Sequence, residues 1–329
     1  MPSPAEIARA ADLLRAGRLV AFPTETVYGL GANALDPAAV ARIYAAKGRP
    51  ATSPLIVHVA SIDMAKSLVA SWPETAHLLT KKFWPGPLTL VLRKKPAIPD
   101  IVTAGLGTAG LRMPAHPIAQ ALLQAAGIPL AAPSANRFTE LSPTTAEHVR
   151  HSLGNAVDLI LDGGPCTVGI ESTVLSLAGP QPLLLRPGAI SRLQLESLIG
   201  PIASAQEISA REIPAGAAHP SPGMHPRHYS PRTSLLLVSN GSLPEQGKGV
   251  YLQYRCPPID GAYPDTRSNA TTPHIQIIPM PADPAAYAAV LYEKLHQADA
   301  AHFDWIAVEQ PPSSPEWEAV NDRLRRAAK

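Results

Sequence analysis

The sequence is poor in cysteine and in aromatic residues. Its 329 residues include only two cysteines, Cys166 and Cys256, which lie far apart and form no CxxC pair. This spacing excludes a zinc site built from cysteines and argues against a disulfide framework. Aromatic residues make up 5% of the chain, whereas apolar residues make up 46%. We therefore expect sizeable hydrophobic cores that are mostly aliphatic.

Segments that would direct the chain to a membrane are also missing. No apolar run approaches the length of about 18 residues that a membrane-spanning helix needs. The start of the chain carries no basic segment followed by an apolar one. The 28 basic and 26 acidic residues give a net charge of +2, which does not mark a nucleic-acid binder, because that requires a clustered basic surface. We expect a soluble, cytoplasmic protein without membrane contact.

Several motifs of familiar enzyme chemistry do not occur. The sequence contains no GxxxxGK[ST] loop, no GxGxxG segment after a strand and no HExxH pair. No serine or cysteine stands in a recognisable nucleophile context. These absences indicate chemistry that relies on positioning and on stabilising anions, without a protein nucleophile. Phosphoryl and nucleotidyl transfers are of that kind.

The order of the predicted elements indicates two domains. Residues 1–200 alternate between helical and strand patterns, and some strands follow one another directly, which favours an α/β domain with a mixed sheet. Residues 201–232 are rich in proline and read as an extended connector. Residues 233–329 resume the alternation and predict a second, smaller α/β domain.

The most informative segment is residues 23–31, PTETVYGLG. It connects an apolar run that ends at Phe22 to a helix start at Asp36-Pro37. Clustered hydroxyl groups and glycines at the end of a buried strand are typical of a loop that lines a site. The same residues could also form a plain polar connection with tight turns.

Basic and small polar residues elsewhere admit two interpretations each. Lys47 and Arg49 flank a sharp turn, where they would either be solvated or clamp a polyphosphate. Arg112 lies in an otherwise apolar strand and needs a ligand carboxylate or an internal acid as its partner. Ser134 and Asn136 form either a tight turn or an anion cradle. Ser142 precedes a predicted helix whose N-terminus would favour anions.

Eight segments, in this order, closely resemble motifs of the YrdC-like family: PTETVYGLG (23–31), KGRP…PLIVH (47–58), WPGPLT (84–89), LRMPAHP (111–117), APSAN (132–136), SPT (142–144), ESTV (171–174) and LRPG (185–188). The length of the chain and the segment GMHPRHYSP (223–231) resemble the long, two-domain form of that family. Beyond residue 233 the resemblance rests on length and α/β character.

The resemblance implies a fold and a reaction. The fold would be a twisted open mixed sheet with a concave cavity, followed by a small Rossmann-like α/β domain. Members of the family combine L-threonine, bicarbonate and ATP into threonylcarbamoyl-AMP and pyrophosphate, for N6-threonylcarbamoyladenosine modification of tRNA. No covalent cofactor is implied; ATP is a substrate, accompanied by Mg²⁺. A partner enzyme would then transfer the threonylcarbamoyl group to tRNA, and tRNA contact is an additional expectation.

The resemblance also implies roles for individual residues. Lys47 and Arg49 are the expected catalytic cations. The threonine pocket would comprise Thr26, His58, Arg112, Ala132 and Ser172. ATP would be held by Lys47, Arg49, Ser53, Thr108, Ser134, Asn136, Ser142, Arg186 and Tyr229. Apart from the resemblance, residues 223–231 hold histidine, arginine and tyrosine between stiffening prolines, which predicts that they fold over the cavity as a lid, the alternative being a plain spacer.

One segment departs from the family pattern, and two other functions compete. Residues 137–140, RFTE, follow SAN where relatives often have a Ser-Gly pair, and Glu140 adds negative charge near the expected phosphates. A YrdC-like module that binds RNA without catalysis is the alternative function, which the intact Lys47, Arg49, Ser134 and Asn136 set disfavours. A carbamoyl-transferring maturation factor would need cysteine-rich zinc modules, which two isolated cysteines exclude.

Overall fold

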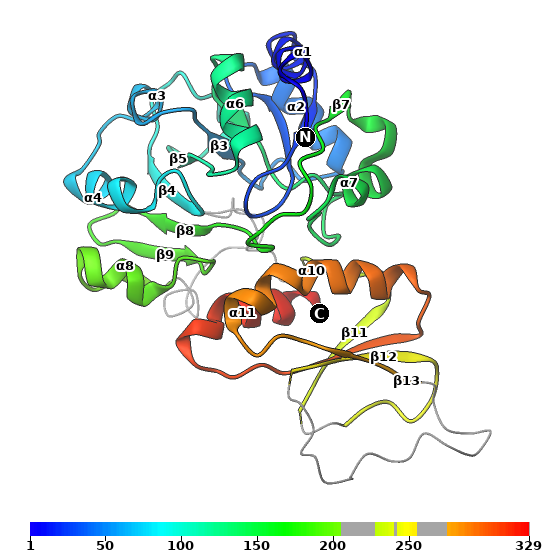
Figure 1. The fold of residues 1–329 in the computed structure, drawn as a ribbon. Coiled ribbons are helices and arrows are strands. Elements are labelled where there is room, and N and C mark those ends of the chain that lie inside the picture. Colours follow the sequence, from blue (N-terminus) through cyan, green and yellow to red (C-terminus); the bar gives the residue numbers. More distant parts are fainter. Residues whose placement is uncertain (205–227, 240–241, 255–274, 329) are drawn as a thin grey trace. The chain divides into compact units, whose positions relative to one another are not determined.

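The computed structural model describes residues 1–204, 228–239, 242–254 and 275–328 (Figure 1). The chain divides into two compact units, one of Met1–Phe138 with Ser142–His225 and one of Thr139–Leu141 with Pro226–Lys329. Most of the predicted connector, including the start of the predicted lid, lies outside the described residues. In the described part of the chain, no helix combines the length and the apolar character needed to cross a membrane.

The first unit is built on a ten-stranded mixed sheet in the order β10-β9-β8-β4-β5-β3-β6-β2-β1-β7. Its strands are β1 (Val20–Phe22), β2 (Gly29–Asn33), β3 (Ile56–His58), β4 (Leu88–Arg93), β5 (Thr108–Arg112), β6 (Leu130–Ala131), β7 (Leu159–Ile160), β8 (Thr173–Ser176), β9 (Leu183–Arg186) and β10 (Ala203–Ser204). Parallel and antiparallel pairs both occur; for example, β3 runs parallel to β5 and antiparallel to β6. The prediction of a mixed α/β sheet is confirmed.

Helices connect these strands. They are α1 (Pro4–Arg15), α2 (Pro37–Lys47), α3 (Ile62–Leu68), α4 (Glu74–Phe83), α5 (Asp100–Thr103), α6 (Pro117–Ala126), α7 (Ala146–Leu153) and α8 (Arg192–Ile199), with a 3-10 turn at Gly154–Ala156. The predicted caps are present: Ser3 forms a capping box with Glu6, and the Asp36 side chain accepts from the Ala38 amide. Such local hydrogen bonds fix where a helix begins, which is why these starts could be read from sequence.

Two local predictions were wrong. Residues 29–33 were expected to belong to a connection, yet they form β2, which pairs with β1 and β6. Sheet pairing on both edges here overrides the low strand preference of glycine. The helix expected from Ser142 begins at Ala146, because the Thr145 side chain accepts from the His148 amide and caps it there. Ser142 therefore precedes the helix and is not its cap.

Aliphatic side chains fill the space between the sheet and its helices. One cluster joins α1 and α6 to β1 through residues such as Leu14, Val20 and Leu122, and α1 and α6 lie side by side (Figure 1). A larger cluster includes Leu30 of β2, Ile43 of α2 and Leu90 of β4. Burial of these side chains is the main stabilising term of the unit.

The second unit contains a four-stranded parallel sheet in the order β11-β14-β12-β13. Its elements are β11 (Ser234–Val238), β12 (Gly249–Gln253), β13 (Ile275–Pro279), α10 (Pro284–Ala300), β14 (Trp305–Glu309), a 3-10 turn at Pro315–Trp317 and α11 (Glu318–Ala327). This arrangement confirms the predicted small α/β domain. In α11 a fully buried arginine, Arg323, lies 2.8 Å from Asp322.

Gly188 follows β9 and lies close to the backbone at the start of β8. A Cβ atom at this position would lie 2.3 Å from the Thr173 amide nitrogen and 2.6 Å from the Ser172 carbonyl carbon. Because backbone atoms cannot move aside cheaply, we expect Gly188→Ala to destabilise the protein by about 1–3 kcal/mol.

The control for this prediction is Gly107→Ala. A Cβ atom at Gly107 would have no neighbour within 4 Å, so this change should leave the unfolding midpoint nearly unchanged. Denaturant unfolding of both variants measures the difference. Equal stability of the two variants would show that the approach at Gly188 is loose.

Candidate functional site

Segments that are far apart in the sequence lie side by side in the first unit. The Tyr28 amide donates to the Pro143 carbonyl, and the Leu30 amide donates to the Pro133 carbonyl, each at 2.8 Å. Gly29 also forms an isolated bridge with Ser134. Backbone hydrogen bonds therefore hold the motifs at 23–31, 132–136 and 142–144 together.

Lys47 and Arg49 are buried at the end of α2. Gly48 between them adopts a left-handed conformation (φ 61°), which ends the helix and turns the chain. The Lys47 ammonium donates to the carbonyl of Ser134, at 2.6 Å, and to that of Asn136. Lys47 is 3% exposed and Arg49 is 7% exposed. These cations are therefore not solvated surface groups, and their role toward a phosphate stays a prediction.

The Arg49 guanidinium is fixed by the loop that leads into β3. It donates to the carbonyls of Ser53, at 3.3 Å, and Pro54, at 3.0 Å. Its central carbon lies 5.8 Å from the centre of the Phe138 ring. Phe138 belongs to the segment that departs from the family pattern, and this contact gives the departure a structural role beside Arg49.

Arg112, at the end of β5, has an internal acid as its partner. Its Nη2 lies 2.7 Å from Glu25 Oε1, and both side chains are buried. Its Nη1 donates to the Thr26 hydroxyl at 2.9 Å, and its Nε donates to the Gly86 carbonyl at 3.2 Å. The internal acid that was one of two open alternatives is therefore present, and it comes from the 23–31 motif.

His58 lies next to Arg112 because β3 and β5 pair in parallel with these two residues in register. Burial, and next the charge of Arg112, lower the pKa of His58 to about 3. The imidazole is therefore neutral at physiological pH. It packs edge-on against Phe22 with 6.2 Å between ring centres.

A second polar group surrounds the start of β8. The Ser172 hydroxyl lies 2.8 Å from that of Thr89. Arg186, on the neighbouring β9, donates to the Ser172 carbonyl at 2.9 Å and to its hydroxyl at 3.2 Å. The Ser142 hydroxyl donates to Glu171 at 2.5 Å. These contacts join the ESTV, LRPG and SPT motifs.

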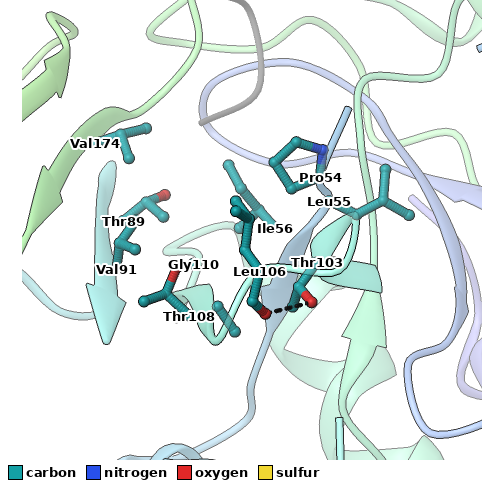
Figure 2. A pocket seen from close by; sticks show the side chains of 11 residues that line it. Pro54, Leu55, Ile56, Thr89, Val91, Thr103, Leu106, Thr108, Gly110 and Val174 are labelled. Carbon is teal, nitrogen blue, oxygen red and sulfur yellow. Dashed lines mark hydrogen bonds between the residues drawn. The ribbon is translucent and has the colours of Figure 1, made fainter. Parts of the chain in front are cut away.

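A small, mostly apolar cavity of about 10 Å³ has Thr89 in its wall (Figure 2). It is lined by Pro54, Leu55, Ile56, Thr89, Val91, Thr103, Leu106, Thr108, Ala109, Gly110 and Val174. The predicted ATP-binding residue Thr108 is therefore part of its wall. Pro54 links the pocket to Arg49, and Thr89 links it to Ser172.

The remaining predicted residues occupy separate places. The Ala132 amide donates to the Ile56 carbonyl, which holds Ala132 next to β3. Tyr229 belongs to the second unit, where it is 1% exposed and packs near Tyr292 and Arg323. Its role toward a nucleotide stays a prediction.

Three polar residues of the site were not predicted: Glu25, Thr89 and Glu171. Glu25 stands beside Thr26 in the motif that looked most informative, and a buried arginine needs an acid or an anion. The sequence therefore contained a signal for Glu25. Thr89 and Glu171 are recognised only from their contacts with Ser172 and Ser142.

Two family models match the chain. The model described as telomere recombination (Sua5_yciO_yrdC) matches residues 12–188. The model of the threonylcarbamoyl-AMP synthase C-terminal domain matches residues 190–329. The two matches together span both units.

Individual relatives agree with these matches. A threonylcarbamoyl-AMP synthase of Bacillus subtilis is 45% identical over 328 residues, which is 98% of this chain and 93% of that protein. One of Pyrococcus abyssi is 48% identical over 229 residues, 70% of this chain and 66% of that protein. The crystal structure of P. abyssi Sua5 complexed with L-threonine has a TM-score of 0.87 and 37% identity, covering 100% of this chain and 95% of that one.

One explanation accounts for the mixed sheet, for the ordered motifs around the buried cations and for the near-complete coverage by relatives of this length. The chain belongs to the Sua5/YciO/YrdC family, in its long form with a Sua5 C-terminal domain.

Proposed function

We propose that this chain is a threonylcarbamoyl-AMP synthase, which joins L-threonine, bicarbonate and ATP into threonylcarbamoyl-AMP and pyrophosphate. The relative from B. subtilis with this name is 45% identical over almost its whole length. The structural observation that carries the proposal is the buried Arg112, with Thr26 and neutral His58 around it. The product would supply the threonylcarbamoyl group for N6-threonylcarbamoyladenosine in tRNA, through a partner enzyme.

The amino acid would bind at Arg112. The guanidinium would take the threonine carboxylate in a charge-assisted contact. Thr26, which already accepts from Arg112, His58 and Ser172 would surround the rest of the ligand, with the backbone at Ala132. L-threonine is bound in the P. abyssi structure, whose fold matches this chain throughout.

The nucleotide would bind along the remaining motifs. Lys47 and Arg49 would neutralise phosphate charge, and Ser134 and Asn136 would donate from the segment that Lys47 contacts. The other proposed ATP contacts are Ser53, Thr108, Ser142, Arg186 and Tyr229. Within the described residues, no group of three or more His, Cys, Asp or Glu side chains could hold a metal ion. We propose that Mg²⁺ accompanies the ATP phosphates as part of the substrate.

The reaction would proceed in two steps. The threonine ammonium and bicarbonate give a carbamate, with release of water and one proton. A carbamate oxygen then attacks the α-phosphorus of ATP, the bond to the β-phosphate oxygen breaks, and pyrophosphate leaves. The second step is a nucleotidyl transfer, in which Lys47 and Arg49 stabilise the charge that develops on the phosphates.

The first test is the reaction itself. The purified full chain should release pyrophosphate from ATP only when both threonine and bicarbonate are present, because the carbamate is the attacking group. Coupled detection of pyrophosphate and of orthophosphate, with each substrate omitted in turn, measures this. Release of orthophosphate, or turnover that is indifferent to threonine, would contradict the proposal; RNA binding without turnover would favour the non-catalytic alternative.

The second test replaces arginine by lysine at two positions, Arg112 and Arg49, in order to separate the two ligand sites. Arg112→Lys keeps a positive charge beside Glu25 but loses the two-nitrogen fork, so the Kd for threonine should rise roughly tenfold to a hundredfold, while the Kd for ATP stays unchanged. Arg49→Lys should raise the Kd for ATP and leave the Kd for threonine unchanged. Calorimetric titration of both variants with each ligand checks this. Equal losses for both ligands in either variant would place that arginine elsewhere.

A further inference from the structure

The Arg112 guanidinium is held on three sides before any ligand arrives. Nε contacts the Gly86 carbonyl, Nη1 contacts the Thr26 hydroxyl and Nη2 contacts the Glu25 carboxylate. A guanidinium carries five N–H donors, so donors remain on both terminal nitrogens for a second carboxylate. A ligand carboxylate can therefore bind Arg112 without displacing Glu25.

Glu25 is itself fixed in place. Its Oε2 accepts from the Ala115 amide at 3.0 Å, and its backbone carbonyl accepts from the Val168 amide at 2.7 Å. Its neighbour Thr26 is held by the Thr24 hydroxyl at 2.8 Å. Since Glu25 is 7% exposed, a move into solvent would require breaking these contacts. Its negative charge therefore stays beside Arg112 when a ligand binds.

The charges next to Arg112 favour a particular class of ligand. Arg112 and Glu25 carry opposite charges 2.7 Å apart and His58 is neutral, while the next buried cation, Arg186, is bound to Ser172. A plain carboxylate would add an uncompensated negative charge to a buried site, which is costly. An amino acid brings its own ammonium group and keeps the balance. The charge of Glu25 also acts on a neighbouring group. The pKa of Cys166 is raised to about 12, mainly by burial and secondly by the negative charge of Glu25.

We propose that Glu25 is a specificity-determining residue: it fixes Arg112 and supplies the negative charge that makes the pocket require an ammonium group next to the ligand carboxylate. This inference rests on the proposed function, because it assumes that the amino acid binds at Arg112. In this proposal, Glu25 of the 23–31 motif allows the site to distinguish an amino acid from the same molecule without its amino group.

The test compares L-threonine with (R)-3-hydroxybutyrate, which is threonine without its amino group. Binding of both is measured by calorimetry on the full chain. The wild type should bind threonine at least about tenfold more tightly, as expected for one charge-assisted contact. In Glu25→Gln, which keeps an acceptor oxygen but removes the charge, that ratio should fall at least about tenfold, and ATP affinity should not change.

Controls keep the test decisive. Glu147→Gln makes the same change at an exposed residue of α7 that pairs with Arg150, and it should leave the ratio unchanged. If Glu25→Gln fails to fold, Glu25→Asp retains the charge and should keep the preference for threonine. Three results would overturn the inference. They are a wild type that binds both ligands equally, a Glu25→Gln variant whose ratio of the two affinities is unchanged, and a folded Glu25→Asp variant that does not prefer threonine. A wild type that binds no threonine would instead refute the proposed function.

Discussion

The site depends on the buried contact between Arg112 and Glu25. It ties the end of β5 to the loop between β1 and β2, and neither charge could be buried alone without a large desolvation cost. Removal of one partner from such a pair typically costs about 3–5 kcal/mol. The contact therefore fixes the two strand ends between which the amino acid would lie. It also explains why an apolar strand carries an arginine.

Sheet register does the rest of the positioning. Parallel pairing of β3 and β5 sets His58 beside Arg112, and antiparallel pairing of β8 and β9 sets Arg186 near Ser172. In each case neighbouring strands deliver one residue from each of two motifs to the same place. Backbone hydrogen bonds join residues 23–31 to residues 132–136, and the Ser134 carbonyl of the second segment accepts from Lys47.

Local signals in the sequence were sufficient for most of the helices and strands. The caps at Ser3 and Asp36 and the apolar strands were predictable because they depend on near neighbours. β2 was not, since Gly29 and Gly31 have little strand preference and only pairing with β1 and β6 holds them extended. The need for an acid or an anion opposite Arg112 was predictable, but only the fold shows that Glu25, in the loop between β1 and β2, is that acid. The irregular register between β8 and β9, at Val174 and Leu175, is equally invisible in the sequence.

The charges of the proposed reaction give the two halves of the site different tasks. Free threonine is neutral overall, and it suits a pocket in which Arg112 and Glu25 already cancel. Conversion of the ammonium to a carbamate leaves two negative charges on the ligand, which that pocket no longer balances. The cations Lys47 and Arg49 would lower the cost of the new charge, and they would do so where the phosphates bind. In the proposed reaction, the surroundings of Arg112 and Glu25 would thus favour the free amino acid, and Lys47 and Arg49 would favour the carbamate and the step that consumes it.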